Sequence, residues 1–153
     1  MLTLLLVGSG GAAVLVLGLL ARKRPAPTDW VVATCKIEHS VPTSPPVRGH
    51  VVFTRTGRQV QVRCNLTGLS YGRHGLHVHA SGDLSKGCAS TSHHYNPLGS
   101  THGGPRGSPR HRGDLGNVWA NGDGRCTTIL LADVTIRELV GRALVVHAGE
   151  DDL

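Results

Sequence analysis

Gly75-Leu76-His77-Val78-His79 places two histidines two residues apart in a segment that is otherwise small or apolar. Successive side chains of a β-strand point to opposite faces of the sheet, so residues two apart share a face. His77 and His79 therefore project side by side if residues 74–80 form a strand. Two neighbouring imidazoles suit two ligands of one metal ion, and this segment predicts a strand that carries a metal site.

Further strands are expected on both sides of this segment, because apolar and polar residues alternate there with the period of two that a half-buried strand shows. Residues 59–66, for example, place their four apolar side chains on one face. The turn signal Asn121-Gly122-Asp123-Gly124 separates two of the later strands. The expected strands cover residues 31–38, 47–54, 59–66, 74–80, 117–120, 127–136 and 142–147.

The composition argues against a helical bundle, since the 153 residues include 21 glycines and 8 prolines, which weaken or break helices. Many short strands with turn residues between them predict a single all-β domain built as a sandwich or barrel. The formal charge of +6 does not indicate a nucleic-acid partner. The run Arg22-Lys23-Arg24 supplies half of that charge, and the other arginines are scattered without interleaved aromatic residues.

The N-terminal residues 2–20 carry no charge and consist mostly of leucine, valine, alanine and glycine. As a helix they would span about 28 Å, close to a bilayer's hydrocarbon core, so they predict one hydrophobic helix that anchors the chain in a membrane. The positive-inside rule would hold Arg22-Lys23-Arg24 and the following domain on the cytosolic side. The alternative is a secretory signal that is cleaved and leaves the domain secreted. Residues 1–24 are thus expected as anchor or signal, residues 25–30 as a linker, and residues 31–153 as the domain.

Histidine is concentrated in one part of the chain. Seven of the ten histidines lie between residues 74 and 111, and residues 81–113 show the periodicity of neither a helix nor a strand. A loop of that length in a compact domain is typically functional. Imidazole with one carboxylate suits zinc, and imidazole alone suits copper. The cluster predicts a metal centre with the candidate ligands His77, His79, His94, His102, His111, Asp114 and His147.

Several motifs follow one another in the order in which one known family has them. They are Gly75-Leu76-His77-Val78-His79, Gly82-Asp83 with Gly87-Cys88, His94-Tyr95-Asn96-Pro97-Leu98, His102-Gly103-Gly104-Pro105, His111-Arg112-Gly113-Asp114-Leu115-Gly116-Asn117, and Gly141-Arg142-Ala143-Leu144-Val145-Val146-His147. On these motifs the chain resembles the copper/zinc superoxide dismutases, from about residue 31 to residue 153. The resemblance implies the family's Greek-key β-barrel or sandwich.

The resemblance also implies a set of metal ligands. The copper ligands would be His77, His79, His94 and His147. The zinc ligands would be His94, His102, His111 and Asp114, so that His94 bridges the two metals. Asp151 stands where the family has a carboxylate that orients one copper-ligand histidine and one zinc-ligand histidine.

The implied activity is the disproportionation of superoxide to dioxygen and hydrogen peroxide, with copper as the redox metal and zinc as its redox-inert neighbour. His94 would be the catalytic residue. Its ring would leave copper and take up a proton in the first half-reaction, and it would give that proton up in the second. Zinc would hold the ring in place and make its proton easier to release.

Some family features have no counterpart in this sequence. In the family a further C-terminal segment follows the position of Leu153. It contains an arginine that guides superoxide, the cysteine that pairs with the counterpart of Cys88, and the last strand. We therefore expect a sandwich without its last strand, an unpaired edge open to a strand-donating partner, and no family-type homodimer. Activity would be reduced; in the alternative, the chain is a non-catalytic dismutase-like protein that binds copper, a copper chaperone or another dismutase subunit.

Overall fold

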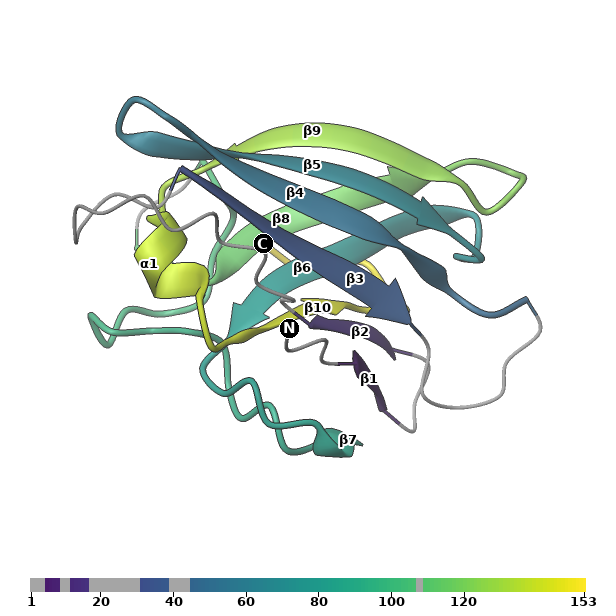
Figure 1. The fold of residues 1–153 in the computed structure, drawn as a ribbon, viewed down its shortest axis with the longest axis horizontal. Helices are drawn as coiled ribbons and strands as arrows, with labels where there is room; N and C mark the ends of the chain where they lie inside the picture. The colour runs from purple at the N-terminus through teal and green to yellow at the C-terminus, as the bar shows by residue number, and fades with distance from the viewer. Residues whose placement is uncertain (1–4, 9–11, 17–30, 39–44, 107–108) are drawn as a thin grey trace.

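The computed structural model describes residues 5–8, 12–16, 31–38, 45–106 and 109–153, which form an all-β fold with one short helix (Figure 1). This architecture confirms the expected fold class. The strands are β1 Leu5–Gly8, β2 Ala12–Val16, β3 Val32–Glu38, β4 Arg48–Thr56, β5 Gln59–Thr67, β6 Gly72–His79, β7 Ser85–Cys88, β8 Asp114–Ala120, β9 Cys126–Ala132 and β10 Ala143–Val146, and the helix is α1 Ile136–Leu139.

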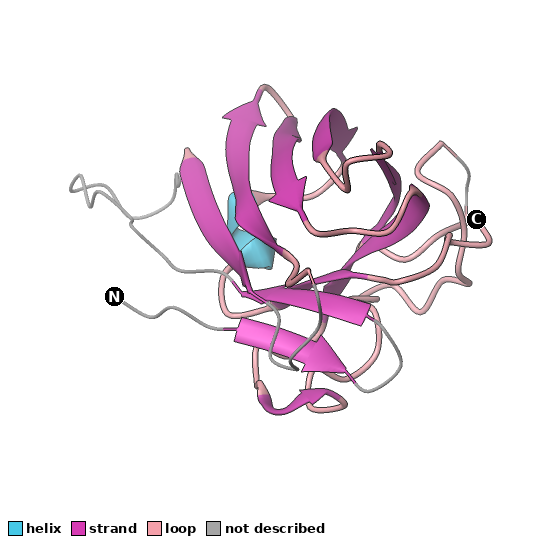
Figure 2. Cartoon of the chain, turned by 90° about the vertical axis from the view of Figure 1, so that its right-hand side faces the viewer, coloured by secondary structure: helices cyan, strands magenta, loops and turns pink. Residues whose placement is uncertain are grey.

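One antiparallel sheet runs through the described strands in the order β8-β6-β10-β2-β3-β4-β5-β9, and β1 also pairs with β2. The sheet curls so that the layer of β3, β4, β5 and β9 faces the layer of β6, β8 and β10 across the interior (Figures 1 and 2). The end strands β8 and β9 contact each other without a hydrogen-bonded ladder between them. The fold is therefore a sandwich that does not close into a barrel.

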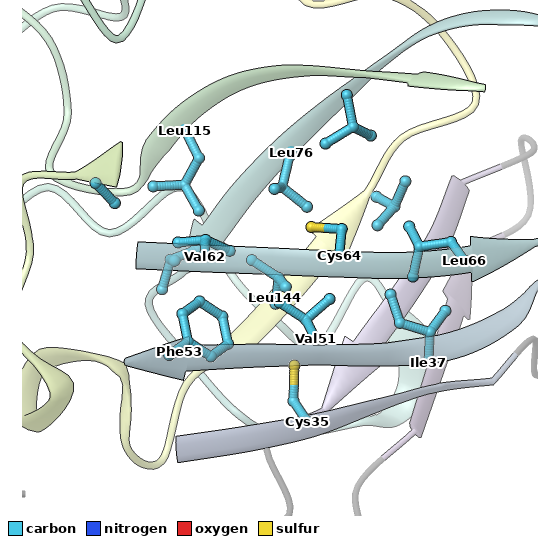
Figure 3. Close-up of a cluster of buried hydrophobic side chains, with 14 of the residues drawn as sticks. Cys35, Ile37, Val51, Phe53, Val62, Cys64, Leu66, Leu76, Leu115 and Leu144 are labelled. Atoms are coloured by element: carbon cyan, nitrogen blue, oxygen red, sulfur yellow. The ribbon is translucent and has the colours of Figure 1, made fainter. Parts of the chain in front are cut away.

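Alternation of apolar and polar residues builds the core between the two layers. Along β5, Val60, Val62, Cys64 and Leu66 are buried, while the polar residues between them face away from the core. β3 and β4 contribute in the same way, and Leu76, Leu115 and Leu144 come from the opposite layer (Figure 3). The period of two seen in the sequence thus identifies the inward faces correctly.

Three of the four cysteines belong to this core, and all four are free thiols. Cys35, Cys64 and Cys126 are each buried, and Figure 3 shows Cys35 and Cys64 among apolar side chains. Burial raises the pKa of the Cys35 thiol well above its usual range and raises that of Cys64 to about 12. Both side chains are therefore protonated and act as small apolar residues.

Two elements differ from the sequence-based expectation. The strand expected over residues 127–136 ends at Ala132, and α1 begins soon after it. Thr135 caps α1: its hydroxyl accepts the backbone N–H of Glu138, and the Glu138 carboxylate accepts the backbone N–H of Thr135. A threonine three residues before a glutamate is the sequence signature of this type of helix cap. The other element is β7, which lies within the long connection 81–113 and shows no alternation in the sequence.

The N-terminal hydrophobic helix is a wrong prediction wherever its residues are described. Residues 5–8 and 12–16 form β1 and β2, and no helix in the described part of the chain is long and apolar enough to span a membrane. An apolar run suits a strand between other strands as well as it suits a helix, and periodicity does not separate the two. The rest of the 2–20 run and the 25–30 linker lie outside the described residues.

The unpaired edge expected from the missing last strand is not found beside β10. β10 pairs with β6 on one side and with β2 on the other, and β2 also reaches the end of β3. The backbone groups that a missing strand would leave open have partners from the N-terminal segment instead. The expectation failed because it considered only strands that follow β10 in the sequence.

Three backbone hydrogen bonds join the segments that carry the candidate ligands. Val78 N–H donates to the Gly113 carbonyl at 2.8 Å, Tyr95 N–H to the Val78 carbonyl at 2.7 Å, and Gly113 N–H to the Tyr95 carbonyl at 2.8 Å. A side chain on residue 113 would not fit, since a Cβ there would lie 2.2 Å from the Val78 carbonyl oxygen. We call these three bonds the backbone triangle; it sets β6, the segment around residue 94 and the start of β8 against one another.

Gly113→Ala should disrupt this triangle, because the added methyl group meets backbone atoms that cannot move aside. We expect the free energy of unfolding to fall by about 1–3 kcal/mol or more, measured by urea unfolding of the metal-free protein. Gly122→Ala is the matched control, since a Cβ at residue 122 meets nothing within 4 Å. Equal midpoints for the two variants would contradict the role assigned to the triangle.

Candidate metal centre

The fold brings together every residue that the sequence singled out as a candidate ligand. β6 supplies two of them, the connection before β8 and the first residue of β8 supply four, and the segment after β10 supplies the rest. Their ligand atoms form two groups, and within each group these atoms lie within 4.8 Å of one another. The copper-type group consists of His77, His79, His94 and His147, and the zinc-type group consists of His94, His102, His111 and Asp114.

The copper-type group is a set of closely packed imidazoles. The ring centroid of His77 lies 4.0 Å from that of His94 and 4.7 Å from that of His147. The His79 ring approaches His94 at 5.1 Å. His77 and His79 point to the same face of β6, as the period of two predicts, and both are buried.

Three buried nitrogen atoms in this group have neither a hydrogen-bond partner nor an ionic partner among the described residues: Nδ1 of His77 and Nε2 of His79 and of His147. The other ring nitrogen of His77, Nε2, faces a carboxylate oxygen of Asp151 at 3.0 Å. The tautomer of His79 follows from its surroundings. Its Nδ1 donates to the Ser92 carbonyl at 2.8 Å, which leaves the lone pair of Nε2 free. A buried polar atom without a partner costs free energy unless something binds it. Lone pairs gathered at one place fit a metal ion.

Burial keeps these imidazoles uncharged. Burial, with a smaller contribution from the neighbouring histidines, lowers the pKa of His77 to about 2 and those of His79 and His147 to about 4. A metal ion binds the neutral form of imidazole, so these rings are in the binding state at neutral pH.

Asp114 is the centre of the zinc-type group. Its carboxylate lies 2.8 Å from Nδ1 of His94, 3.0 Å from Nδ1 of His102 and 3.2 Å from Nδ1 of His111. Backbone N–H groups of His111 and Gly103 donate to its Oδ2 at 3.0 and 3.2 Å. Burial alone would raise the pKa of Asp114, but these donors and the neighbouring histidines lower it, so the carboxylate is charged. Three imidazoles and one carboxylate match the ligand set of a closed zinc site.

His94 belongs to both groups and joins them. Its Nδ1 is held by Asp114, so Nε2, on the other edge of the ring, is the nitrogen left for the copper-type group. One ring can thus link two metal sites, as the resemblance implied.

Asp151 also connects the two groups. Its Oδ1 accepts from Nε2 of His102 at 2.9 Å and lies 3.0 Å from Nε2 of His77. Asn117 holds Asp151 in place: its side chain accepts the Asp151 backbone N–H at 2.8 Å and donates to the Asp151 carbonyl at 3.2 Å. Asn117 positions Asp151 and Ser92 positions His79, and reasoning from the spacing of the ligands identified neither of these two supporting residues. Asn117 ends one of the matching motifs, whereas nothing in the sequence marks Ser92.

A cavity of about 290 Å³ borders the copper-type group beside His77 and His147. Its wall also includes three consecutive acidic residues, Glu150, Asp151 and Asp152. Arg73 donates to Glu150 at 2.6 Å and offsets one of these charges. The wall of the cavity therefore combines acidic residues with two histidines of the copper-type group, and Asp151 lies directly beside His77.

Comparison with known proteins gives consistent matches. The sequence model of the family described as copper/zinc superoxide dismutase (SODC) matches residues 47–153. The copper chaperone for superoxide dismutase of Sus scrofa is 46% identical over 112 residues, which cover 72% of this chain and 41% of that protein. The human protein of the same name is 45% identical over 109 residues, which cover 70% of this chain and 40% of that protein.

A dismutase and a solved structure match as well. The extracellular superoxide dismutase (Cu-Zn) of Drosophila melanogaster is 44% identical over 119 residues, which cover 70% of this chain and 62% of that protein. The crystal structure of the clock protein EA4 superposes with a TM-score of 0.68 at 33% identity and covers 93% of this chain and 78% of that chain. The chain spans about two fifths of the length of the chaperones and under two thirds of that of the dismutase. Because the family's sequence model matches residues 47–153, which is most of this chain, the chain belongs to the copper/zinc superoxide dismutase family.

Proposed function

We propose that this domain binds copper in the copper-type group and zinc in the zinc-type group, and that it disproportionates superoxide. The observation that carries the metal assignment is the set of buried imidazole nitrogens without partners in the copper-type group. The zinc assignment is supported by the charged Asp114 carboxylate among three imidazoles. Bound copper would supply the one-electron redox chemistry that zinc lacks.

His94 is the residue that we propose to move protons. Asp114 holds one edge of its ring, so the nitrogen on the other edge is the one that takes up and releases a proton beside the copper-type group. The side chain of His94 is 22% exposed, compared with 5% for His77, so protons from solvent reach His94 more readily. Asp151 fixes the orientation of His77 and His102 while this happens.

A second function is favoured by the cavity and by the relatives. Acidic residues repel an anion such as superoxide and attract a cation. A cavity lined by Glu150, Asp151 and Asp152 beside His77 and His147 therefore suits the entry or release of a copper ion. Two of the similar proteins are named copper chaperones for superoxide dismutase. In this second proposal the domain carries copper or engages a dismutase subunit and turns over little superoxide.

His94→Ala tests the metal assignment. Because His94 contributes to both groups, its loss should weaken the binding of both metals. We expect the variant to retain less than half of the copper and less than half of the zinc that the parent protein retains after dialysis. Elemental mass spectrometry measures both metal contents. His93→Ala is the matched control, since His93 is exposed and belongs to neither group. A parent protein that keeps neither metal, or a variant that keeps both in full, would show that the assignment is wrong.

The two functions are separated by two measurements on the same metal-loaded protein. A dismutase should accelerate superoxide loss, and His94→Ala should remove that acceleration. A copper carrier should instead transfer copper to a metal-free dismutase, and replacing Glu150 and Asp152 by glutamine and asparagine should slow the transfer. Acceleration without transfer supports the enzyme, and transfer without acceleration supports the carrier.

The metal-free protein should lose stability as the solution becomes acidic. The pKa values of His77, His79 and His147 are about 2 to 4 in the folded chain, against an ordinary value of about 6.5 in the unfolded chain. Between these pH values the unfolded chain binds more protons than the folded chain. Each unit by which the pH is lowered should therefore reduce the free energy of unfolding by about 1.4 kcal/mol for each imidazole. Above about pH 7 these groups are neutral in both states and contribute no slope. Urea unfolding across this pH range checks the prediction, and a profile without slope would contradict it.

A further inference from the structure

β10 is a short strand with both faces buried. Leu144 and Val146 belong to the main core, whereas Ala143 and Val145 pack on the other face beside Leu84 and Cys88. The four residues of β10 are at most 1% exposed. Buried backbone N–H and C=O groups need hydrogen-bond partners, so a strand of this kind must have a neighbour on each side.

β6 is the neighbour on one side, and β2 is the neighbour on the other. All four residues of β10 oppose residues of β2, with Ala143 opposite Val16 and Val146 opposite Ala13. β2 has two further partners: β1 pairs with it over residues 12–15, and the end of β3 pairs with Leu15 and Val16. Figure 1 shows β2 beside β10, near the end of β3.

We propose that residues 12–16 are a closing strand supplied by the same chain: they occupy the slot along the edge of β10 that β6 leaves free, and they hold β10 in register. β1 and the end of β3 pair with this closing strand in turn. The sequence Ala-Ala-Val-Leu-Val contains no charge, glycine or proline. Such a segment suits a position next to a strand that is buried on both faces, where every ladder hydrogen bond is needed.

The closing strand also bears on the copper-type group, and this step rests on the proposed function. His147 follows Val146 directly, and its backbone N–H donates to the Gly75 carbonyl at 2.8 Å. Its carbonyl lies 2.8 Å from Nδ1 of the buried His74. A β10 that loses β2 would loosen the strand on which the position of His147 depends. Occupation of the slot should therefore raise the affinity for copper more than the affinity for zinc.

Cysteine trapping tests the slot without breaking the fold. Directly opposed residues of an antiparallel pair bring their Cβ atoms close enough for a disulfide. We expect the full-length, metal-free chain with Val14→Cys and Val145→Cys, or with Leu15→Cys and Leu144→Cys, to form an intrachain disulfide under mild oxidation. Val14→Cys with Leu144→Cys is the control, because these two positions are one residue out of register. Mass spectrometry of the digested protein separates the new bond from bonds to native cysteines.

Proline substitution measures what the closing strand contributes. Successive N–H groups of a strand point to opposite sides, so one of the variants Val14→Pro and Leu15→Pro removes a hydrogen bond to β10. That variant should speed hydrogen exchange of the amides of residues 144–146 at least tenfold in the metal-free protein, and a synthetic peptide of residues 11–17 should reverse this. Leu15→Val is the control and should leave exchange unchanged.

Three results would overturn the proposal. The first is equal trapping of the in-register and out-of-register pairs, and the second is exchange that neither proline variant alters. The third is a disulfide that joins two chains and depends on protein concentration, which would assign the slot to a second copy. The disulfide trapping and the hydrogen exchange are both measured on metal-free protein, so their outcome does not depend on whether the metal assignment is correct. Loss of copper from the proline variant, with zinc retained, then tests the link to His147.

Discussion

The close contact at Gly113 is the constraint on which the metal centre depends. The candidate ligands lie on segments that are far apart in the sequence, and hydrogen bonds among Val78, Tyr95 and Gly113 fix their relative positions at the level of the backbone. Backbone contacts of this kind leave little freedom, because a shift of one segment breaks bonds to both of the others. The side chains that project from the three segments therefore meet with their positions already determined.

Burial then decides the chemical state of the side chains that meet there. The copper-type imidazoles His77, His79 and His147 are neutral because burial disfavours their charged form, whereas Asp114 is charged because backbone and side-chain donors surround it. Two neighbouring groups thus differ in charge although they share His94. A neutral nitrogen site beside a site with a fixed negative charge is an arrangement that can distinguish two metals by their ligand preferences.

Much of the fold and the centre could be predicted from the sequence, because the relevant signals are local. The spacing of His77 and His79, and the alternation in β5, follow directly from strand geometry. The place of Asp151 came from the resemblance to a family. The N-terminal strands could not be predicted in this way, since residues 12–16 read equally as helix or buried strand until their partner is known. That partner, β10, lies near the other end of the chain, and no local sequence pattern predicts that the two strands pair.

The buried cysteines have a consequence for the chemical history of each molecule. Thiol exchange and oxidation proceed through the exposed thiolate, and Cys35 and Cys64 are enclosed and protonated in the folded chain. An oxidant can reach them only when the layer of β3, β4 and β5 separates from the layer opposite. Irreversible oxidation of these two thiols to the sulfinic or sulfonic acid therefore records that a molecule has opened, whereas the same oxidation of the half-buried Cys88 carries no such information.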